Sequence, residues 1–142
     1  MYREKFSKEH LLKCQKGIEL YNGGFLWECH EELEDPWVED AHSAVRYVYW
    51  AIIQVATAVF HYENANLAGA QGMLNKAKDK FQFLEANDIE SDLLYKFLAW
   101  KKFKKLVFEI PASPCLEDFK NLSNFKFSRP DKWQQHLLDD KE

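Results

Sequence analysis

Apolar residues recur every three to four positions along most of the chain, which is the spacing of one face of an α-helix. No segment shows the strict apolar–polar alternation of a half-buried strand. The pattern predicts an all-α protein, a compact bundle of about five helices with an irregular C-terminal tail. The predicted helices span residues 4–21, 25–35, 43–62, 67–87 and 92–109, with a short helix near 116–122.

Turn and capping residues separate these helices. Gly23 and Gly24 are expected to end the first helix, because glycine accepts the left-handed conformation of a C-cap. Pro36 predicts a kink or the end of the second helix, since proline has no amide donor. Three polar residues are placed to cap the later helices at their N-termini: Ser43, Asn66 and Ser91.

The third helix is apolar nearly all round, which predicts that it is the central helix. Its stretch without acidic or basic residues, 47–62, has sixteen residues and is too short for a bilayer-spanning helix, so no membrane partner is expected. Residues 1–110 are predicted to form the helical bundle. Residues 111–142 are predicted to form a tail that packs on it through Phe125, Phe127 and Trp133.

Composition narrows the picture. With 142 residues, of which 46% are hydrophobic, the chain can bury a core without disulfides or a structural metal. A net charge of −4 leaves no chain-wide attraction for nucleic acid, and no nucleic-acid partner is expected. Cys14, Cys29 and Cys115 have no C-x-x-C spacing, as is typical of free thiols in a reducing compartment. Because the N-terminus also lacks the apolar core of a signal peptide, we expect a cytoplasmic protein.

The segment from Trp27 to Glu34 carries the main anomaly of the sequence. On a helical wheel His30 and Glu34 lie one turn apart within the apolar face. An unpaired buried carboxylate is costly, so Glu34 should find a cation or a donor, or hold its own proton. The neighbouring acids mostly face solvent, with one of them at the boundary of the apolar face: Glu28, Glu32 and Asp35, and at the boundary Glu31.

Polar residues of the third helix could complete a buried cluster. Folding the two helices together about a turn near Asp40 sets Glu34 opposite Arg46 and His30 opposite Trp50. Gln54 and His61 are seven residues apart and share a face of the third helix. The candidate polar cluster therefore has six members: His30, Glu31, Glu34, Arg46, Gln54 and His61.

Three interpretations of this cluster stay open. It could be a buried hydrogen-bond network that fixes the pairing of the helices. It could be a divalent-metal site in which His30, Glu34 and His61 hold zinc or iron, although neither the H-E-x-x-H nor the E-x-x-H pattern is present. It could also be an acid/base site in which a desolvated Glu34 transfers a proton. Cys29 points inward near acidic residues, which should raise its pKa and leave it a packing role.

Charge is distributed unevenly along the chain. No Lys or Arg occurs from Gly17 to Val45, where eight acidic residues lie, whereas four lysines lie between 101 and 105. These faces are expected to be solvated and, for the lysines, to complement the helix dipole. The alternative is a phosphate or nucleic-acid contact that uses the aromatic residues beside the lysines, Trp100 and Phe103.

Two motifs resemble the domain of unknown function 309 family of small helical proteins. The first, N-x-G-x-x-[FW]-E-x-H-E-x-x-E-x-x-W, is matched by Asn22, Gly24, Trp27, Glu28, His30, Glu31, Glu34 and Trp37. The second is matched by Gln54, His61, Asn66, Gly69 and Ala70, with Ala51 and Ala65 where the family has glycine. The resemblance covers about residues 6–84. It implies an all-helical bundle and no established activity.

These observations lead to a functional hypothesis with one alternative. We expect a binding or interaction module for a small molecule or a protein, built around the buried polar cluster. The alternative is a metal-dependent or acid/base hydrolase that uses the same cluster, and no catalytic residue is assigned. The high aromatic content also makes a homo-oligomer possible.

Overall fold

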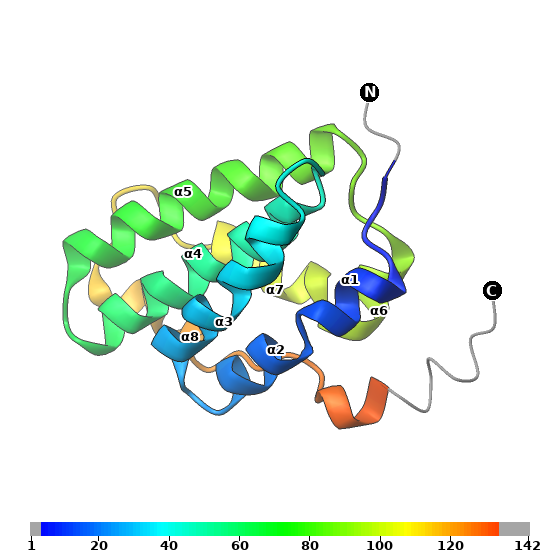
Figure 1. The fold of residues 1–142 in the computed structure, drawn as a ribbon. Coiled ribbons are helices and arrows are strands. Elements are labelled where there is room, and N and C mark those ends of the chain that lie inside the picture. The colour runs from blue at the N-terminus through cyan, green and yellow to red at the C-terminus, as the bar shows by residue number, and fades with distance from the viewer. Residues whose placement is uncertain (1–3, 134–142) are drawn as a thin grey trace.

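A computed structural model describes residues 4–133 of the chain, and these residues form helices and connecting loops without a strand (Figure 1). The prediction of an all-α protein is confirmed. The helices are α1 (Lys8–Lys13), α2 (Gln15–Asn22), α3 (Leu26–Glu39), α4 (Arg46–Glu63), α5 (Leu67–Ala86), α6 (Asp92–Leu98), α7 (Trp100–Phe108) and α8 (Lys120–Ser123). Short 3-10 helices span Leu116–Phe119 and Pro130–Lys132. Within residues 4–133 no helix has the length and apolarity that crossing a bilayer requires.

The central helix is α4, as predicted. It lies between α3 and α5 and packs more extensively against these two helices than any other pair of elements does (Figure 1). Its side chains from Val48 to Val59 are buried on every face, with the exception of Trp50. An all-round apolar helix is stable only when neighbours cover it on all sides, and here they do.

Close contact between α2 and α3 depends on a residue without a side chain. A Cβ atom on Gly17 would lie 2.6 Å from Cγ and Cδ2 of Leu33, closer than carbon atoms approach. Leu33 is fully buried, so the glycine lets α3 settle against α2 and brings the motif-bearing helix into the core.

Two of the predicted helices are broken. The first is interrupted at Cys14 (φ −95°, ψ 1°), whose thiol donates to the carbonyl of Leu11 (3.1 Å). The last is interrupted at Ala99, which adopts a left-handed conformation (φ 49°, ψ 42°) and separates α6 from α7. Alanine has the highest helix propensity, so nothing in the local sequence announces the second break.

The expected kink or stop at Pro36 is wrong as a helix end. α3 continues through Pro36 to Glu39, and the amide of Asp40 donates to the Pro36 carbonyl (2.9 Å). An interior proline costs about 3 kcal/mol of helix stability. Tertiary contacts offset this cost, because the Pro36 ring is buried and the next residue, Trp37, packs on Trp50.

Two of the three predicted caps are confirmed. The side chain of Asn66 accepts from the amide of Gly69 (3.0 Å), and that of Ser91 accepts from the amide of Leu94 (3.4 Å). The prediction for Ser43 is wrong, since α4 begins at Arg46 and its N-cap is Val45. The Ser43 hydroxyl instead accepts from the amide of Val45 and donates to the carboxylate of Glu4.

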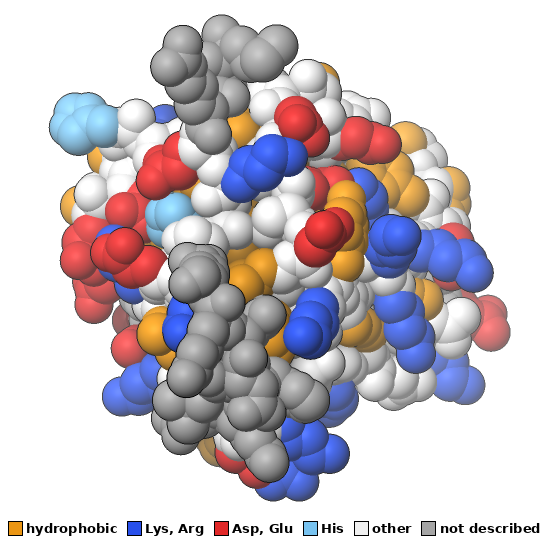
Figure 2. Space-filling model, turned by 90° about the vertical axis from the view of Figure 1, so that its right-hand side faces the viewer, with side chains coloured by type: hydrophobic (Ala, Val, Ile, Leu, Met, Phe, Trp, Pro, Cys, Tyr) orange, Lys and Arg blue, Asp and Glu red, His pale blue; other side chains and the backbone are white. Residues whose placement is uncertain are grey.

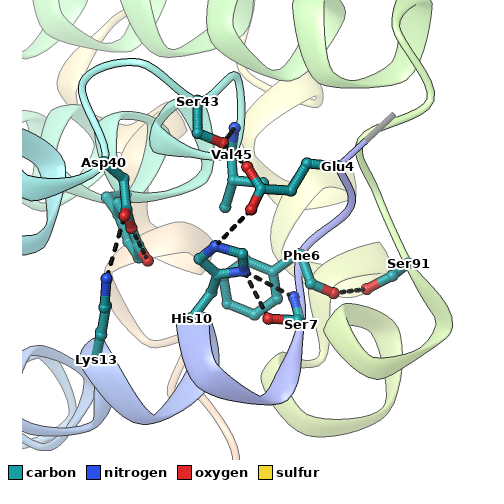
Figure 3. A network of polar contacts seen from close by, with 10 residues as sticks. Glu4, Phe6, Ser7, His10, Lys13, Asp40, Ser43, Val45 and Ser91 are labelled. Carbon is teal, nitrogen blue, oxygen red and sulfur yellow. Dashed lines mark hydrogen bonds and ion pairs between the residues drawn. The ribbon is translucent and has the colours of Figure 1, made fainter. Parts of the chain in front are cut away.

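That contact belongs to a polar network that ties the N-terminal segment to the bundle (Figure 3). Nδ1 of His10 accepts from the amide of Ser7 (3.0 Å), and Nε2 of His10 faces Glu4 (3.5 Å). The hydroxyl of Ser91 donates to the Phe6 carbonyl (2.7 Å). Residues 4–7 are thereby held against both the α3–α4 loop and the start of α6.

The C-terminal segment also packs on the bundle within the described residues. Phe125, Phe127 and Trp133 are buried, and the Phe127 ring lies 4.9 Å from that of Tyr21. Asn22 pairs with the backbone of Phe127 through two hydrogen bonds, of 2.8 and 3.0 Å. The division of the chain at residue 110 stays a prediction, and residues 134–142 of the predicted tail lie outside the described part.

Candidate functional site

Two pairs of aromatic side chains define how α3 and α4 face each other. Trp27 contacts Phe60 and Trp37 contacts Trp50, each with ring centroids 5.4 Å apart. A step of ten residues forward on α3 corresponds to a step of ten residues back on α4, so both pairs belong to one antiparallel register. This register places Thr57 at the level of His30.

The predicted register is therefore wrong by two helical turns, since it set Trp50 opposite His30. The physical reason is the position of the connection. Because α3 runs past Pro36 to Glu39 and α4 begins only at Arg46, the chain reverses later than the predicted turn near Asp40. Arg46 consequently lies beyond the end of the His30–Glu34 pair rather than opposite it.

His30 and Glu34 form an ion pair along α3, with Nε2 and Oε1 3.0 Å apart. The pair was expected to be buried, but the Glu34 side chain is 51% exposed. The other ring nitrogen of His30, Nδ1, is shielded from solvent and has no hydrogen-bond partner within the described residues. The Trp27 ring, 4.9 Å away, covers the imidazole.

The remaining predicted members are dispersed along the two helices. Gln54 is buried, and its Oε1 has no partner in residues 4–133. Glu31 is exposed. His61 lies at the other end of α4, where its Nδ1 is 3.3 Å from Nδ2 of Asn66. The six residues are thus not one buried cluster.

The predicted metal ligands are not gathered either. Among residues 4–133, no group of three or more His, Cys, Asp or Glu side chains is arranged to hold a metal ion. The predicted set of His30, Glu34 and His61 is not such a group, because His61 contacts the α4–α5 turn instead of the pair on α3. A zinc or iron cofactor stays a prediction.

Arg46 occupies a site of its own among aromatic rings. Its guanidinium carbon lies 5.6 Å from the ring centre of Trp37, 5.8 Å from that of Tyr47 and 5.5 Å from that of Trp50. Such cation–π contacts hold a guanidinium without neutralising it. We call these four residues, with Lys80 and Phe83 of α5, the Arg46 cluster.

Two of the three thiols are buried, that of Cys14 at the break between α1 and α2 and that of Cys29 on α3. Burial raises the pKa of Cys29 to about 12 and that of Cys14 still higher. The expected direction for Cys29 is confirmed, but desolvation and not acidic neighbours is the cause. All three cysteines are free, and Cys115 is exposed.

One lysine of α7, Lys104, is held within the fold, and the other three are exposed. Lys104 contacts the buried carboxylate of Glu90 at 2.9 and 3.0 Å, and Lys101 lies over the ring of Tyr95. In the face shown in Figure 2, several Lys and Arg side chains lie on the right-hand side, with Asp and Glu side chains next to some of them. Both expected aromatic neighbours, Trp100 and Phe103, are fully buried and cannot stack on a ligand.

Glu90 is a buried polar residue that the sequence pattern did not reveal. Its carboxylate accepts from Nε1 of Trp100 (2.6 Å) and from the hydroxyl of Tyr95 (2.8 Å), besides its contact with Lys104. It lies in the loop before α6, outside any periodic segment, so a helical wheel cannot predict that its side chain is buried. The only indication in the sequence is the set of side-chain donors on α6 and α7, which follow it.

A comparison with known protein families matches one range of the chain, and all six predicted cluster residues lie in that range. Residues 14–73 match the family described as a domain of unknown function, DUF309. The resemblance predicted from the motifs is confirmed over this range, which is shorter than residues 6–84. The DUF309 segment comprises α2, α3, α4 and the first turns of α5.

The chain is also similar to an uncharacterized protein, YpuF of Bacillus subtilis (strain 168). Identity is 38% over 57 residues, which cover 40% of this chain. The match spans 33% of YpuF, about one third of that relative's length. No solved structure gives a significant match to the chain.

The fold gives several DUF309 motif positions a structural role. Gly24 has a positive φ of 83° at the α2–α3 turn, and Asn66 caps α5. Ala65, where the family has glycine, also adopts a positive φ, 57°. Glycine therefore suits position 65 for its backbone conformation. Trp27, Glu31 and Glu34 are motif positions whose side chains are exposed, although Trp27 also contacts Phe60 and Glu34 also pairs with His30.

Proposed function

We propose that this protein is a protein-binding module that docks its partner on α3. The observation that carries the proposal is an exposed stripe along this helix. Trp27, Glu31, Glu34 and Val38 follow the spacing i, i+4, i+7 and i+11, which places them in one line, and all four are exposed. We call them the α3 stripe.

The composition of the α3 stripe suits a protein interface. Trp27 leaves 44% of its surface exposed although it contacts His30 and Phe60 on its other side. Tryptophan is the residue type most enriched among residues that dominate binding energy. A large aromatic held in place from beneath loses little conformational freedom when a partner covers it.

The polar residues of the α3 stripe point to the partner's chemistry. Glu31 and Glu34 lie between an apolar residue at each end, so a matching helix would present a cation flanked by apolar side chains. His30 pairs with Glu34 and fixes its position. The interaction is a helix-against-helix contact in this proposal, with α3 as the fixed half.

The alternative of a hydrolase lacks such support. A general base must reach the proton that it removes, and the unpaired nitrogen of His30 is shielded from solvent. The other nitrogen is occupied by Glu34. A small-molecule ligand would need a concave apolar pocket, whereas the α3 stripe lies on a convex helix surface.

A photo-crosslinking amino acid at position 27, 38 or 108 tests the proposal in cells. Phe108 on α7 is the matched control, since it is a large hydrophobic residue with similar exposure, 39%, on another helix. We expect one protein to be captured at both positions 27 and 38 and not at 108. Equal capture at all three positions, or none at 27 and 38, would refute the proposal.

Binding of the captured protein to purified variants provides the second measurement. Trp27→Ala should weaken binding at least tenfold, because it removes the one large aromatic anchor of the α3 stripe. Phe108→Ala should leave the affinity unchanged. Thermal unfolding of both variants shows whether the fold is intact, and an unchanged affinity of a folded Trp27→Ala variant contradicts the proposal.

A further inference from the structure

The Arg46 cluster lies where three helices meet at one end of the bundle. The end of α3, the start of α4 and the C-terminal half of α5 come together beside the α3–α4 loop (Figure 1). Val38, the last residue of the α3 stripe, directly follows Trp37 of this cluster. A partner lying along α3 would therefore reach the Arg46 cluster.

Arg46 has no acidic partner in the described part of the chain. None of the carboxylates in residues 4–133 forms an ion pair with it, although its side chain is half-buried against three rings. A desolvated guanidinium without a counter-charge is costly, whereas one held on aromatic faces keeps its donors in a fixed plane. This arrangement leaves an oriented cation ready for an anion.

Lys80 adds a second cation to the same ring. Its Nζ lies 4.4 Å from the centre of the Trp50 ring, which Arg46 contacts at 5.5 Å, so the two charges are within about 10 Å of each other. Lys80 donates to the carbonyl of Lys76 and to no carboxylate of the described part.

The Arg46 cluster offers donors but no anionic acceptor. The two cations are these donors, whereas the indole Nε1 of Trp37 is buried beneath the surface and has no acceptor in residues 4–133, so it reports on the cluster without contacting a ligand. The rest of the cluster is aromatic surface, with Tyr47 stacked on Phe83 at 3.9 Å. A complementary ligand brings oxygen acceptors with negative charge next to apolar groups. The planar fork of arginine matches a carboxylate in particular.

We propose that Arg46 and Lys80 bind the carboxylates of an acidic segment in the partner protein. This inference rests on the proposed function and deepens it, because it names the chemistry of the partner at the C-terminal end of α3. The α3 stripe is acidic in its middle and the Arg46 cluster is cationic, so the two charges together fix the direction in which the partner lies.

A blocked acidic peptide, acetyl-Glu-Leu-Glu-Leu-Glu-amide, is the probe for a first test. Titration into the 15N-labelled full-length protein is followed by NMR at the indole N–H of Trp37 and at Nε–H of Arg46. We expect both signals to move in a saturable way. Arg46→Gln should weaken binding at least tenfold and Lys80→Gln about threefold. Lys102→Gln, at an exposed lysine of α7, should have no effect.

Matched ligands separate the possible sources of the charge. The same peptide with Gln in place of Glu should produce no shift, and inorganic phosphate should bind at least tenfold more weakly than the acidic peptide. Arg46→Lys keeps the charge and should restore part of the affinity lost in Arg46→Gln. The inference is overturned by an equal response to the Gln peptide or to phosphate, by no saturable shift, or by a folded Arg46→Gln variant that binds as the wild type does.

The captured partner distinguishes failure of this inference from failure of the proposed function. If position 27 captures a partner whose affinity is unchanged by Arg46→Gln, the carboxylate site is wrong and the α3 stripe stands. If positions 27 and 38 capture nothing, the proposed function fails whatever the peptide does. Concentration-dependent self-association lost in Arg46→Gln would identify a second copy of this chain as the source of the acids and would overturn a separate partner protein.

Discussion

A Cβ atom on Gly69 would lie 2.7 Å from Cγ of His61, so the imidazole occupies the space that any side chain at position 69 would need. The same Cβ would lie 2.7 Å from Nδ2 of Asn66, the residue that caps α5. His61, Asn66 and Gly69 therefore form one unit that closes the α4–α5 turn. The fold thus gives His61 a packing role at this turn.

Gly69→Ala should lower the free energy of unfolding by about 1–3 kcal/mol, because the methyl group displaces either the imidazole or the capping amide. Urea denaturation measures the change. Gly72→Ala is the control on the same helix, since its Cβ would meet nothing within 4 Å. That substitution should stabilise the protein by about 1 kcal/mol through helix propensity. Equal effects of the two substitutions would contradict the proposed packing.

Ala65→Gly should stabilise the protein by up to about 1 kcal/mol, because Ala65 has a φ of 57° and glycine adopts this conformation without steric cost. The same denaturation measurement applies. Ala68→Gly, in the first turn of α5, is the control and should destabilise. A loss of stability in Ala65→Gly would show that the left-handed turn is not what position 65 requires.

Glu90→Gln should destabilise by about 2–4 kcal/mol, because it leaves Lys104 without its buried counter-charge and sets an amide N–H₂ among three donors. Glu109→Gln is the control, since Glu109 pairs with Lys105 at 4.0 Å on the surface. Its effect should stay within about 0.5 kcal/mol. A neutral Glu90→Gln variant would contradict the assigned network.

Stability should fall as the pH rises above about 9. Burial raises the pKa values of Cys14 and Cys29 in the folded state, so folding favours their neutral forms. This contribution is complete below the pKa of the unfolded thiol and is lost as the pH rises through it towards the folded value. Raised pKa values of Tyr21 and Tyr49 act in the same direction above about pH 10.

The expected loss between pH 8 and pH 10 is about 2–3 kcal/mol, which urea denaturation at each pH measures. Cys29→Ala should flatten the profile, whereas Cys115→Ser, at an exposed position, should leave its shape unchanged. A wild-type profile that is flat up to pH 10 would mean that the thiols ionise as readily in the folded chain as in the unfolded one.

The sequence predicted the helical class, the central helix and two caps, because these depend on local periodicity and on side chains that bond to their own backbone. The register of α3 against α4 was wrong because it depends on where the chain reverses. Pro36 stays within α3, because its own ring is buried and Trp37 packs on Trp50. The chain therefore reverses later than predicted. No local rule ranks these tertiary contacts against the cost of Pro36.

The candidate site was predicted in its residues but not in its arrangement. A wheel correctly placed His30 beside the core, yet the Glu34 side chain, one turn further along α3, is half exposed. Arg46 was assigned to Glu34, and it rests on three rings instead. Sequence spacing gives the direction of a side chain on its own helix, whereas the neighbouring helix decides whether that direction is covered.

The two hydrogen bonds between Asn22 and Phe127 join the turn that leads into α3 to a segment more than a hundred residues away. They connect the DUF309 segment to a part of the chain that the family match does not include. Breaking these hydrogen bonds would release the turn at the N-terminus of α3, just before Trp27. The C-terminal segment is thus bonded to the turn that precedes the helix carrying the exposed stripe, and a change in this segment would act on α3 through that turn.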